Sequence, residues 1–342
     1  MTPSEPNADR RVMITGASGF IGSRLVDRLV GAGQSVTIVL ADWVPDSHLI
    51  RESSLLSSVN VRVGRVEDFG FLQQVIARDR IDTVYHLAAV ATEGAAFGDP
   101  LAAFETNIRG TYNLLEACRR SDGQVERVVV ASSDKAYGEA AQLPYVETMA
   151  MNGRNPYDVS KSCADLLARA YAGSYGLPAA VGRYGNVFGP GDLDYSRLIP
   201  GTIRRLHNDE APLVKKPADG EFARDYLYIE DAVDSYLAMS DGLDARVAVG
   251  QAYNFAMGVP RSPLHVVNEL RRLMGKEHLA PHIVEPRHDE ILHQHISIDK
   301  ARRQLGWAPK WSLADGLIES VGWYSRHLAG GVAGFDRLAS GI

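Results

Sequence analysis

The stretch TGASGFIG, Thr15–Gly22, decides the fold of this 342-residue chain. A short β-branched run, Arg11–Thr15, precedes it, and a segment in which Ile21, Leu25 and Leu29 recur every four residues follows it. A strand that turns through glycines into an amphipathic helix is typical of a βαβ unit, in which helices join parallel strands. The sequence therefore predicts that a parallel sheet begins here.

The glycines of this stretch have separate roles in a strand-to-helix turn. Gly16 permits a tight turn, Gly19 lets the backbone approach a pyrophosphate, and Gly22 lets the helix pack closely on the sheet. The start of the helix, at Phe20 and Ile21, presents free N–H groups and a positive dipole to phosphates. We predict that these residues bind a dinucleotide cofactor. A tight turn without a ligand is the alternative.

The alternation of strand and helix patterns continues through the first half of the chain. Short apolar runs lie at Arg11–Thr15, Val36–Leu40, Val59–Val63, Thr83–His86, Arg127–Ala131 and Ala179–Arg183. Continuous apolar strands between amphipathic helices indicate a parallel sheet that is covered on both faces. We therefore predict an α/β fold whose larger domain is a doubly wound (Rossmann) sheet.

Glycine and proline residues break this pattern after residue 185. We place the dinucleotide-binding domain at residues 11–185 and a smaller α/β substrate-binding domain at residues 186–330. The segment 225–256 is again strand- and helix-like, and we expect it to rejoin the first domain. Residues 1–10 and 331–342 are expected to be flexible ends.

The composition excludes several classes of protein. The net charge is -6 and the basic residues are scattered, which argues against a nucleic-acid surface. No apolar run approaches the roughly 20 residues that a membrane helix needs. Cys118 and Cys163 form no CxxC motif, so we expect a cytoplasmic protein without a disulfide framework. His293 and His295 lack further ligands nearby in sequence, so we predict no metal site.

The end of the second strand bears on the choice of cofactor. An acid there would bind the adenosine ribose and favour NAD over NADP. Leu40 stands at this place, and Asp42 lies two residues later, on the same side of an extended chain. No arginine follows directly to receive a 2′-phosphate. We predict NAD with Asp42 as a ligand. NADP is the alternative cofactor, and a solvated loop position is the alternative for Asp42.

Tyr157 and Lys161 form a YxxxK pair on a predicted helix after Pro156. The i,i+4 spacing places both on one helix face. A nearby ammonium favours phenolate, so Lys161 is expected to lower the pKa of Tyr157. Tyr157 would then take a proton from a sugar hydroxyl as a hydride leaves for a nicotinamide. An ordinary exposed helix pair is the alternative interpretation.

Further motifs occur in a fixed order along the chain. They are the glycine turn, His86–Ala89, Ser132–Gly138, the Tyr157/Lys161 pair, Gly185–Gly191 and Arg224–Tyr226. Together they resemble the extended short-chain dehydrogenase/reductase family, specifically its nucleotide-sugar epimerases and dehydratases. The resemblance extends from about Arg11 to about His327. It implies a substrate that is a nucleotide-diphosphate sugar and a catalytic role for both Tyr157 and Lys161, which would also contact the cofactor.

The resemblance assigns roles to several more residues. Ser133 takes the place of the family's catalytic Ser/Thr and would hydrogen-bond the reacting hydroxyl. Asn186 and Arg224 would hold the diphosphate or nucleotide, and Arg287 would be a second phosphate clamp, because a guanidinium fork suits phosphate geometry. The cofactor would also lie against three residues after the fourth strand. These are Leu87, Ala88 and Ala89.

The chain departs from the family pattern at the adenosine end of the cofactor. The family places an acid at the strand end where Leu40 sits, and another near the adenine where Arg65 sits. Asp68 lies close to Arg65 in sequence, and we predict that it substitutes there.

The residues after Ser133 bear on the type of reaction. Oxidation of a sugar carbon yields a ketone and acidifies the neighbouring C–H bond, and a dehydratase needs an acid for the departing hydroxyl and a group for the C5 proton. Asp134 and Lys135 could supply both, and Ser133-Asp134-Lys135 resembles the Ser/Thr-Asp-Lys triplet of CDP-glucose 4,6-dehydratases. The dTDP-glucose enzymes carry Asp-Glu instead. A strand-end ion pair without chemistry is the alternative.

We therefore expect a nucleotide-sugar 4,6-dehydratase that makes a 4-keto-6-deoxy sugar through transient oxidation at C4. A 4-epimerase on the same scaffold and a non-catalytic cofactor-binding regulator are the alternatives.

A homodimer is also expected. The helical segments Leu101–Cys118 and Tyr157–Ser174 carry apolar residues on more than one face, so that one face covers the sheet and another needs a partner. The apolar residues include Leu114, Leu115, Leu166 and Leu167. The family that the chain resembles pairs these two helices between subunits.

Overall fold

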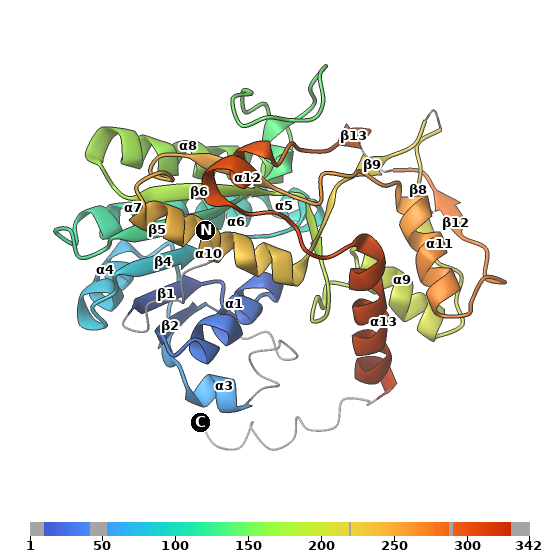
Figure 1. The fold of residues 1–342 in the computed structure, drawn as a ribbon, viewed down its shortest axis with the longest axis horizontal. Coiled ribbons are helices and arrows are strands. Elements are labelled where there is room, and N and C mark those ends of the chain that lie inside the picture. The colour runs from blue at the N-terminus through green and yellow to red at the C-terminus, as the bar shows by residue number, and fades with distance from the viewer. Residues whose placement is uncertain (1–9, 42–52, 219, 287–289, 330–342) are drawn as a thin grey trace.

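The computed structural model describes residues 10–41, 53–218, 220–286 and 290–329. Its larger part is a seven-stranded parallel sheet in the order β11-β6-β5-β4-β1-β2-β3 (Figure 1). The strands are β1 (Arg11–Thr15), β2 (Ser35–Leu40), β3 (Asn60–Val63), β4 (Thr83–His86), β5 (Arg127–Ser133), β6 (Ala179–Tyr184) and β11 (Ala252–Phe255). This topology confirms the predicted doubly wound α/β fold.

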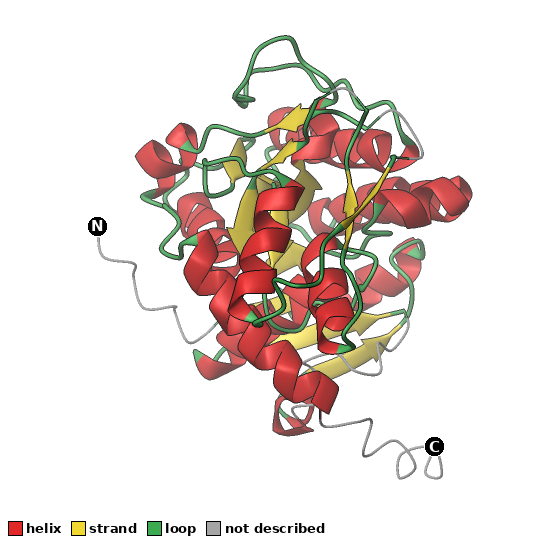
Figure 2. Ribbon diagram, turned by 90° about the vertical axis from the view of Figure 1, so that its right-hand side faces the viewer, coloured by secondary structure: helices red, strands yellow, loops and turns green. Residues whose placement is uncertain are grey.

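Helices cover both faces of the sheet (Figure 2). On one face lie α1 (Phe20–Gly31) and α10 (Ile229–Asp244), and on the other lie α4 (Phe69–Arg78), α7 (Gly110–Arg119) and α8 (Pro156–Tyr175). Each face of the sheet has its own hydrophobic core, and alternate residues of β1 contribute to the two. Val12 packs in the core on the side of α1, whereas Met13 packs in the core on the side of α4 and α7. Both faces of the strand are therefore apolar, which explains its continuous run of apolar residues.

Short helical segments lie between the strands of this sheet along the chain. They are α3 (Ser53–Ser57), α5 (Glu93–Gly98), α6 (Pro100–Phe104), a π-helix (Glu105–Arg109) and a 3₁₀ turn (Asp134–Tyr137). Within the described ranges, no helix is both long and apolar enough to cross a bilayer.

A smaller lobe lies beside the sheet and contains three two-stranded parallel pairs. The pairs are β7 (Asn186–Phe188) with β10 (Tyr226–Tyr228), β8 (Leu213–Lys215) with β12 (His282–Val284), and β9 (Ala223–Arg224) with β13 (His293–Gln294). Its helices are α9 (Leu198–His207), α11 (Pro263–Leu273) and α13 (Leu313–Ala329). The chain returns to the sheet through α10 and β11, and the domain boundary at residue 186 stays a prediction.

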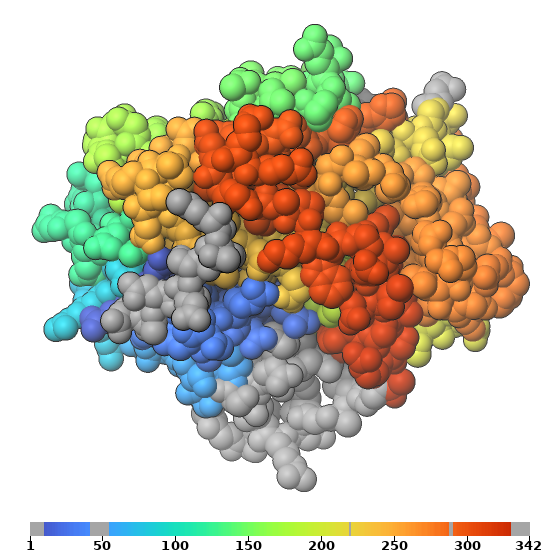
Figure 3. Space-filling model, viewed as in Figure 1, coloured from blue at the N-terminus to red at the C-terminus, as the bar shows by residue number. Residues whose placement is uncertain are grey.

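The last part of the chain connects the two lobes. Helix α12 (Asp299–Leu305) packs on α10 and β11 of the larger lobe, and α13 packs on α9 and β10 of the smaller lobe. The stretch from α12 to α13 crosses the front of the molecule in Figure 3, where it is coloured red. The described part of the chain therefore passes between the two lobes five times: before β7, before α10, between β11 and α11, between β13 and α12, and between α12 and α13.

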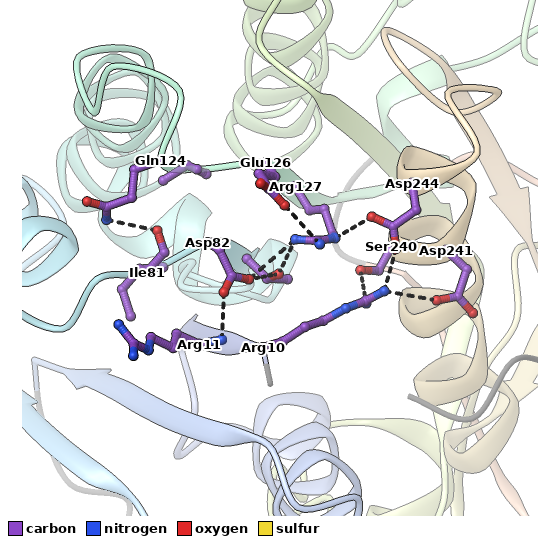
Figure 4. A network of polar contacts seen from close by, with 12 residues as sticks. Arg10, Arg11, Ile81, Asp82, Gln124, Glu126, Arg127, Ser240, Asp241 and Asp244 are labelled. Carbon is purple, nitrogen blue, oxygen red and sulfur yellow. Dashed lines mark hydrogen bonds and ion pairs between the residues drawn. The ribbon is translucent and has the colours of Figure 1, made fainter. Parts of the chain in front are cut away.

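A network of charged side chains fastens the end of α10 to the starts of β1 and β5 (Figure 4). Arg10 Nη1 donates to Ser240 Oγ at 3.0 Å, and a second guanidinium nitrogen of Arg10 contacts Asp244. Arg127 Nε donates to Asp244 Oδ1 at 2.6 Å, and its Nη1 reaches Asp82 Oδ1 at 3.3 Å. Asp244 therefore joins two nearly buried arginines.

We predict that Asp244→Asn lowers the free energy of unfolding by about 1–3 kcal/mol, because both arginines lose a charged partner while they stay nearly buried. Urea denaturation measures this change. Asp241→Asn is the matched control: Asp241 is also on α10, but it only approaches Arg10 at 3.6 Å. Equal losses in the two variants would contradict the assignment.

The predicted dimer face involves α7 and α8, whose leucines differ in exposure. Leu114 and Leu115 lie in the core beneath the sheet, whereas Leu166 is 51% exposed and Leu101 is 70% exposed. Tyr112 on the neighbouring α7 is exposed too. The outer face of α7 and α8 therefore exposes apolar side chains, and a partner subunit on this face stays a prediction.

The expected homodimer should be visible in light scattering at micromolar concentration. Leu166→Glu should shift it toward monomer, because the carboxylate would be buried in the contact without a partner. Val247→Glu, also on an exposed apolar residue but outside α7 and α8, should leave the mass unchanged. A wild-type monomer would refute the homodimer.

Candidate active site

Three groups of predicted site residues lie at the carboxyl ends of β1, β4 and β5. In a doubly wound sheet the ligand lies at this edge, where the strand order reverses. Here the reversal is at β1, which is flanked by β2 on one side and β4 on the other. The glycine turn follows β1, Leu87–Ala89 follow β4, and Ser133 ends β5.

The glycine turn packs directly against the backbone after β4. Gly16 has a φ of +73°, and a Cβ atom there would lie 2.7 Å from Ala88 N. A Cβ on Gly22 would lie 2.2 Å from Gly16 O, so neither position has space for a side chain. A Cβ on Gly19 would meet only Gly16 O, at 3.2 Å, and thus points away from the rest of the turn.

The start of α1 is suited to a diphosphate. Gly19 is its N-cap residue, and as a glycine it has no side chain that could accept a hydrogen bond from the N–H groups of the first turn, at Phe20 and Ile21. These donors and the helix dipole would favour an anion. The turn and the helix start therefore fit the predicted dinucleotide, and Gly16, Gly19 and Gly22 provide the close approach that it needs.

His86 fixes the backbone next to the turn. Its Nδ1 lies 2.7 Å from Thr15 Oγ1 and its Nε2 lies 3.0 Å from Thr111 Oγ1. Burial lowers the pKa of His86 to about 3, so the imidazole is neutral. Thr15 Oγ1 also accepts a hydrogen bond from Ala88 N at 3.2 Å. His86 is therefore a packing residue, and half-buried Leu87 and Ala89 flank the contact.

Tyr157 and Lys161 lie on the first two turns of α8, which begins at Pro156. Lys161 Nζ is 5.9 Å from the centre of the Tyr157 ring and donates to Ala131 O at 3.1 Å. Burial lowers the pKa of Lys161 to about 8. Tyr157 and Lys161 therefore lie on the same face of α8, as predicted.

The predicted effect on Tyr157 is wrong for this structure. Burial raises the pKa of Tyr157, and the Ser133 hydroxyl opposes that rise more than any other group does. Removal from water penalises the phenolate, and the sequence spacing does not show how deeply the ring is buried. The pKa of the free protein thus favours the neutral phenol.

Ser133 and Asp134 form the turn at the end of β5. The Ser133 hydroxyl accepts from Lys135 N at 3.2 Å and donates to Asp134 Oδ1 at 3.2 Å. Asp134 is 3% exposed, and its Oδ2 is buried without a hydrogen-bond partner in the described part of the chain. Burial raises the pKa of Asp134, although Lys135 and Ser133 oppose the rise. The carboxyl group is therefore biased toward its protonated form.

Lys135 points toward another strand end. Its Nζ lies 2.8 Å from Oε1 of Glu93, which opens α5 after β4. The Glu93 carboxylate also raises the pKa values of Tyr157 and Asp134, although it is a smaller cause there than burial. The sequence analysis missed Glu93 because it lies outside every motif. Only the N-cap at Thr92 marks this turn in the sequence.

The predicted substrate ligands lie at the junction of the two lobes. Asn186 begins β7, and its Nδ2 donates to Asp225 O at 3.4 Å. Arg224 is 8% exposed and donates to Leu292 O at 2.8 Å, so it is not a solvated surface charge. Arg224 also lowers the pKa of Asp134, which places its charge near that acid. Arg287 lies outside the described residues.

The adenosine end of the predicted cofactor site is only partly described. Asp42 lies outside the described residues. Asp68 is the N-cap of α4, and its Oδ1 accepts from Phe71 N at 3.0 Å. Its contact with a cofactor stays a prediction. Across the described residues, no group of three or more His, Cys, Asp or Glu side chains is placed to hold a metal ion.

Comparisons with known proteins agree with the fold and with the expected class of enzyme. A family model described as the NAD dependent epimerase/dehydratase family matches residues 12–256. The CDP-glucose 4,6-dehydratase of Salmonella typhimurium is 30% identical over 342 residues, which cover 94% of this chain and 92% of that protein. Among solved structures, a UDP-glucose 4-epimerase of Thermotoga maritima with UDP-glucose has a TM-score of 0.82 at 28% identity, over 93% of this chain and 99% of that one.

Some relatives are much longer. A trifunctional UDP-glucose 4,6-dehydratase, UDP-4-keto-6-deoxy-D-glucose 3,5-epimerase and UDP-4-keto-L-rhamnose-reductase of Arabidopsis thaliana is 30% identical over 328 residues. The match covers 93% of this chain but only 48% of that protein, so this chain spans about half of its length. Dehydratases and epimerases both occur among the relatives, and the comparisons confirm the predicted NAD-dependent enzyme without separating the two reactions. Because the family model matches more than half of its residues, the chain belongs to the NAD dependent epimerase/dehydratase family.

Proposed function

We propose that this enzyme is a nucleotide-sugar 4,6-dehydratase, which converts a nucleoside-diphosphate hexose into its 4-keto-6-deoxy form. The buried acid Asp134 carries the proposal. A dehydratase must protonate the departing C6 hydroxyl, whereas a 4-epimerase has no such leaving group. Burial raises the pKa of Asp134, which favours the protonated carboxyl group that such a donor needs. Asp134 also follows directly after Ser133, at the carboxyl end of β5.

The cofactor and the substrate would occupy the two sides of this strand edge. The glycine turn and the start of α1 would hold the diphosphate of NAD, with Leu87, Ala88 and Ala89 beside it. NADP is the alternative cofactor. When bound, NAD would supply the hydride acceptor for C4 and, once reduced, the hydride donor for C6. Asn186 and Arg224 would hold the substrate diphosphate or nucleotide at the junction of the lobes, with Arg287 as a further clamp.

The first oxidation needs a base at the C4 hydroxyl. Ser133 would hydrogen-bond this hydroxyl, and Tyr157 would take its proton. Because burial disfavours the phenolate, Tyr157 needs positive charge nearby, and Lys161 supplies an ammonium beside the ring. These three residues suffice for oxidation in an epimerase as well as in a dehydratase.

The second step removes water from the 4-keto sugar. The ketone acidifies the C5–H bond, so C5 can lose a proton while Asp134 protonates the C6 oxygen. The Lys135 ammonium would stabilise the negative charge that spreads from C5 to the C4 oxygen. The 4-epimerase reading leaves Asp134 and Lys135 without a chemical task.

Tyr157→Phe should lower kcat by a factor on the order of 10²–10⁴, because the C4 hydroxyl loses its base. The binding of NAD, measured by calorimetry, should stay near the wild-type value. Tyr175→Phe is the control, since Tyr175 is an exposed tyrosine at the other end of α8. Near-normal turnover in Tyr157→Phe would refute the role of Tyr157.

The Asp134→Asn variant tests the dehydratase directly. Asn cannot protonate a leaving hydroxyl, although it nearly preserves the shape of Asp, so elimination should become the slow step. A 4-keto sugar that still carries its C6 hydroxyl should then accumulate in a single turnover, together with the absorbance of reduced nicotinamide.

A panel of nucleotide sugars with mass analysis of the products completes this test. The wild-type product should have lost one water, and Asp315→Asn, on the exposed start of α13, should behave like the wild type. If Asp134→Asn forms product at the wild-type rate, Asp134 is structural and the 4-epimerase takes precedence. A wild-type product of unchanged mass and altered stereochemistry would also favour the 4-epimerase.

A further inference from the structure

The ion pair between Glu93 and Lys135 joins two neighbouring strand ends at the proposed site. Glu93 opens α5 shortly after β4, and Lys135 follows β5, which pairs with β4. Their charged atoms are 2.8 Å apart, and the Lys135 side chain is 14% exposed while that of Glu93 is 36% exposed. Thr92 caps α5 by accepting from Ala95 N and so fixes the turn that carries Glu93. The pair is therefore positioned by both strands and remains reachable from outside.

The Glu93 carboxylate lies within electrostatic reach of the reacting groups. It is among the causes that raise the pKa values of Tyr157 and Asp134, and it acts on Asp158 as well. Helix α5, which Glu93 opens, packs against α8, which carries Tyr157, and the Lys135 partner of Glu93 directly follows Asp134. The proposed base for C4, the proposed acid for C6 and the Glu93 carboxylate thus come from elements that are in contact. C5 lies between C4 and C6 in the sugar, so a group that handles the C5 proton must lie close to that base and that acid.

The chemistry of the two partners decides which of them can take that proton. A lysine ammonium has three donors and no acceptor, so Lys135 can accept a proton only after it has lost one. A carboxylate accepts a proton directly. Within this pair, Glu93 is therefore the acceptor and Lys135 the positive partner that steadies a developing enolate.

We propose that Glu93 is the catalytic base that removes the C5 proton during elimination and returns it afterwards. This inference rests on the proposed dehydratase function. The C5–H bond breaks, its proton goes to Glu93, and its electron pair forms the C5=C6 double bond. The C6–O bond breaks at the same time, and the oxygen leaves as water with the proton of Asp134. When the double bond is later reduced at C6, C5 takes back the proton from Glu93. The proton that Tyr157 took from the C4 hydroxyl balances the one that Asp134 gave.

The test is Glu93→Gln in single-turnover experiments with a nucleotide hexose that the wild type dehydrates. Glutamine keeps an oxygen that can accept a hydrogen bond from Lys135, but it cannot take the C5 proton. Oxidation at C4, followed by the absorbance of reduced nicotinamide, should change far less than elimination, because Glu93 is only a minor cause of the raised pKa of Tyr157. It also shows that the variant is folded. Elimination, followed by mass, should slow by a factor on the order of 10²–10⁴.

Isotopes and matched variants separate a base from a positioning residue. With substrate deuterated at C5, Glu93→Gln should show a primary isotope effect on elimination, because C5–H cleavage has become the slow step. Glu93→Asp retains a carboxylate and should recover part of the rate. Glu105→Gln, on a half-buried glutamate that pairs with Arg109, should match the wild type.

Each possible outcome has a definite meaning. If the wild type removes water and Glu93→Gln does so at the same rate, Glu93 is not the base and the inference fails while the dehydratase stands. If Lys135→Met abolishes elimination but Glu93→Gln slows it only slightly, Lys135 is the base and Glu93 merely orients it. A wild-type product of unchanged mass overturns the dehydratase, and this inference with it.

Discussion

The close contact between the glycine turn and the backbone after β4 is the constraint on which the site depends. A side chain at Gly16 would overlap Ala88, and one at Gly22 would overlap the carbonyl of Gly16. Because these positions are bare, β1, α1 and β4 approach closely enough to share one edge. The open helix start and the loops after β4 and β5 then face the same space. The same contact thus brings the glycine turn close to the end of β4, beside the strand β5 that ends at Ser133.

Burial at this edge of the sheet shifts the pKa of each ionisable group toward its neutral form, so acids and bases shift in opposite directions. It removes the charge from His86, whose pKa is lowered to about 3, and leaves a neutral ring between two threonines. It raises the pKa of Asp134, which favours a proton donor, and it lowers the pKa of Lys161 to about 8. Burial in one low-dielectric environment therefore explains the neutral imidazole of His86, the raised pKa of Asp134 and the lowered pKa of Lys161.

The sequence predicted the parts of the fold that local patterns encode. The bounds of β1 and β4 agree with the predicted runs, because an apolar strand buried on both faces leaves an unbroken signal. Strand β11 has no β-branched residue in its four positions, and its place at the sheet edge depends on pairing with β6. The pKa of Tyr157 was predicted in the wrong direction, since spacing shows which residues are neighbours but not how much water surrounds them.

Glu93 was beyond sequence reasoning for a related physical reason. Its contact with Lys135 arises only because β4 and β5 are adjacent in the sheet, and no local pattern links the two residues. Motifs describe the groups that follow one strand, whereas the chemistry at this edge combines groups from several. In the proposed mechanism, oxidation at C4 would need only Ser133, Tyr157 and Lys161, which β5 and α8 supply. Elimination would add an acid from the turn after β5 and a base from the start of α5, which follows β4. The loop after β4 is thus where a scaffold that oxidises C4 can acquire a second reaction without altering the first.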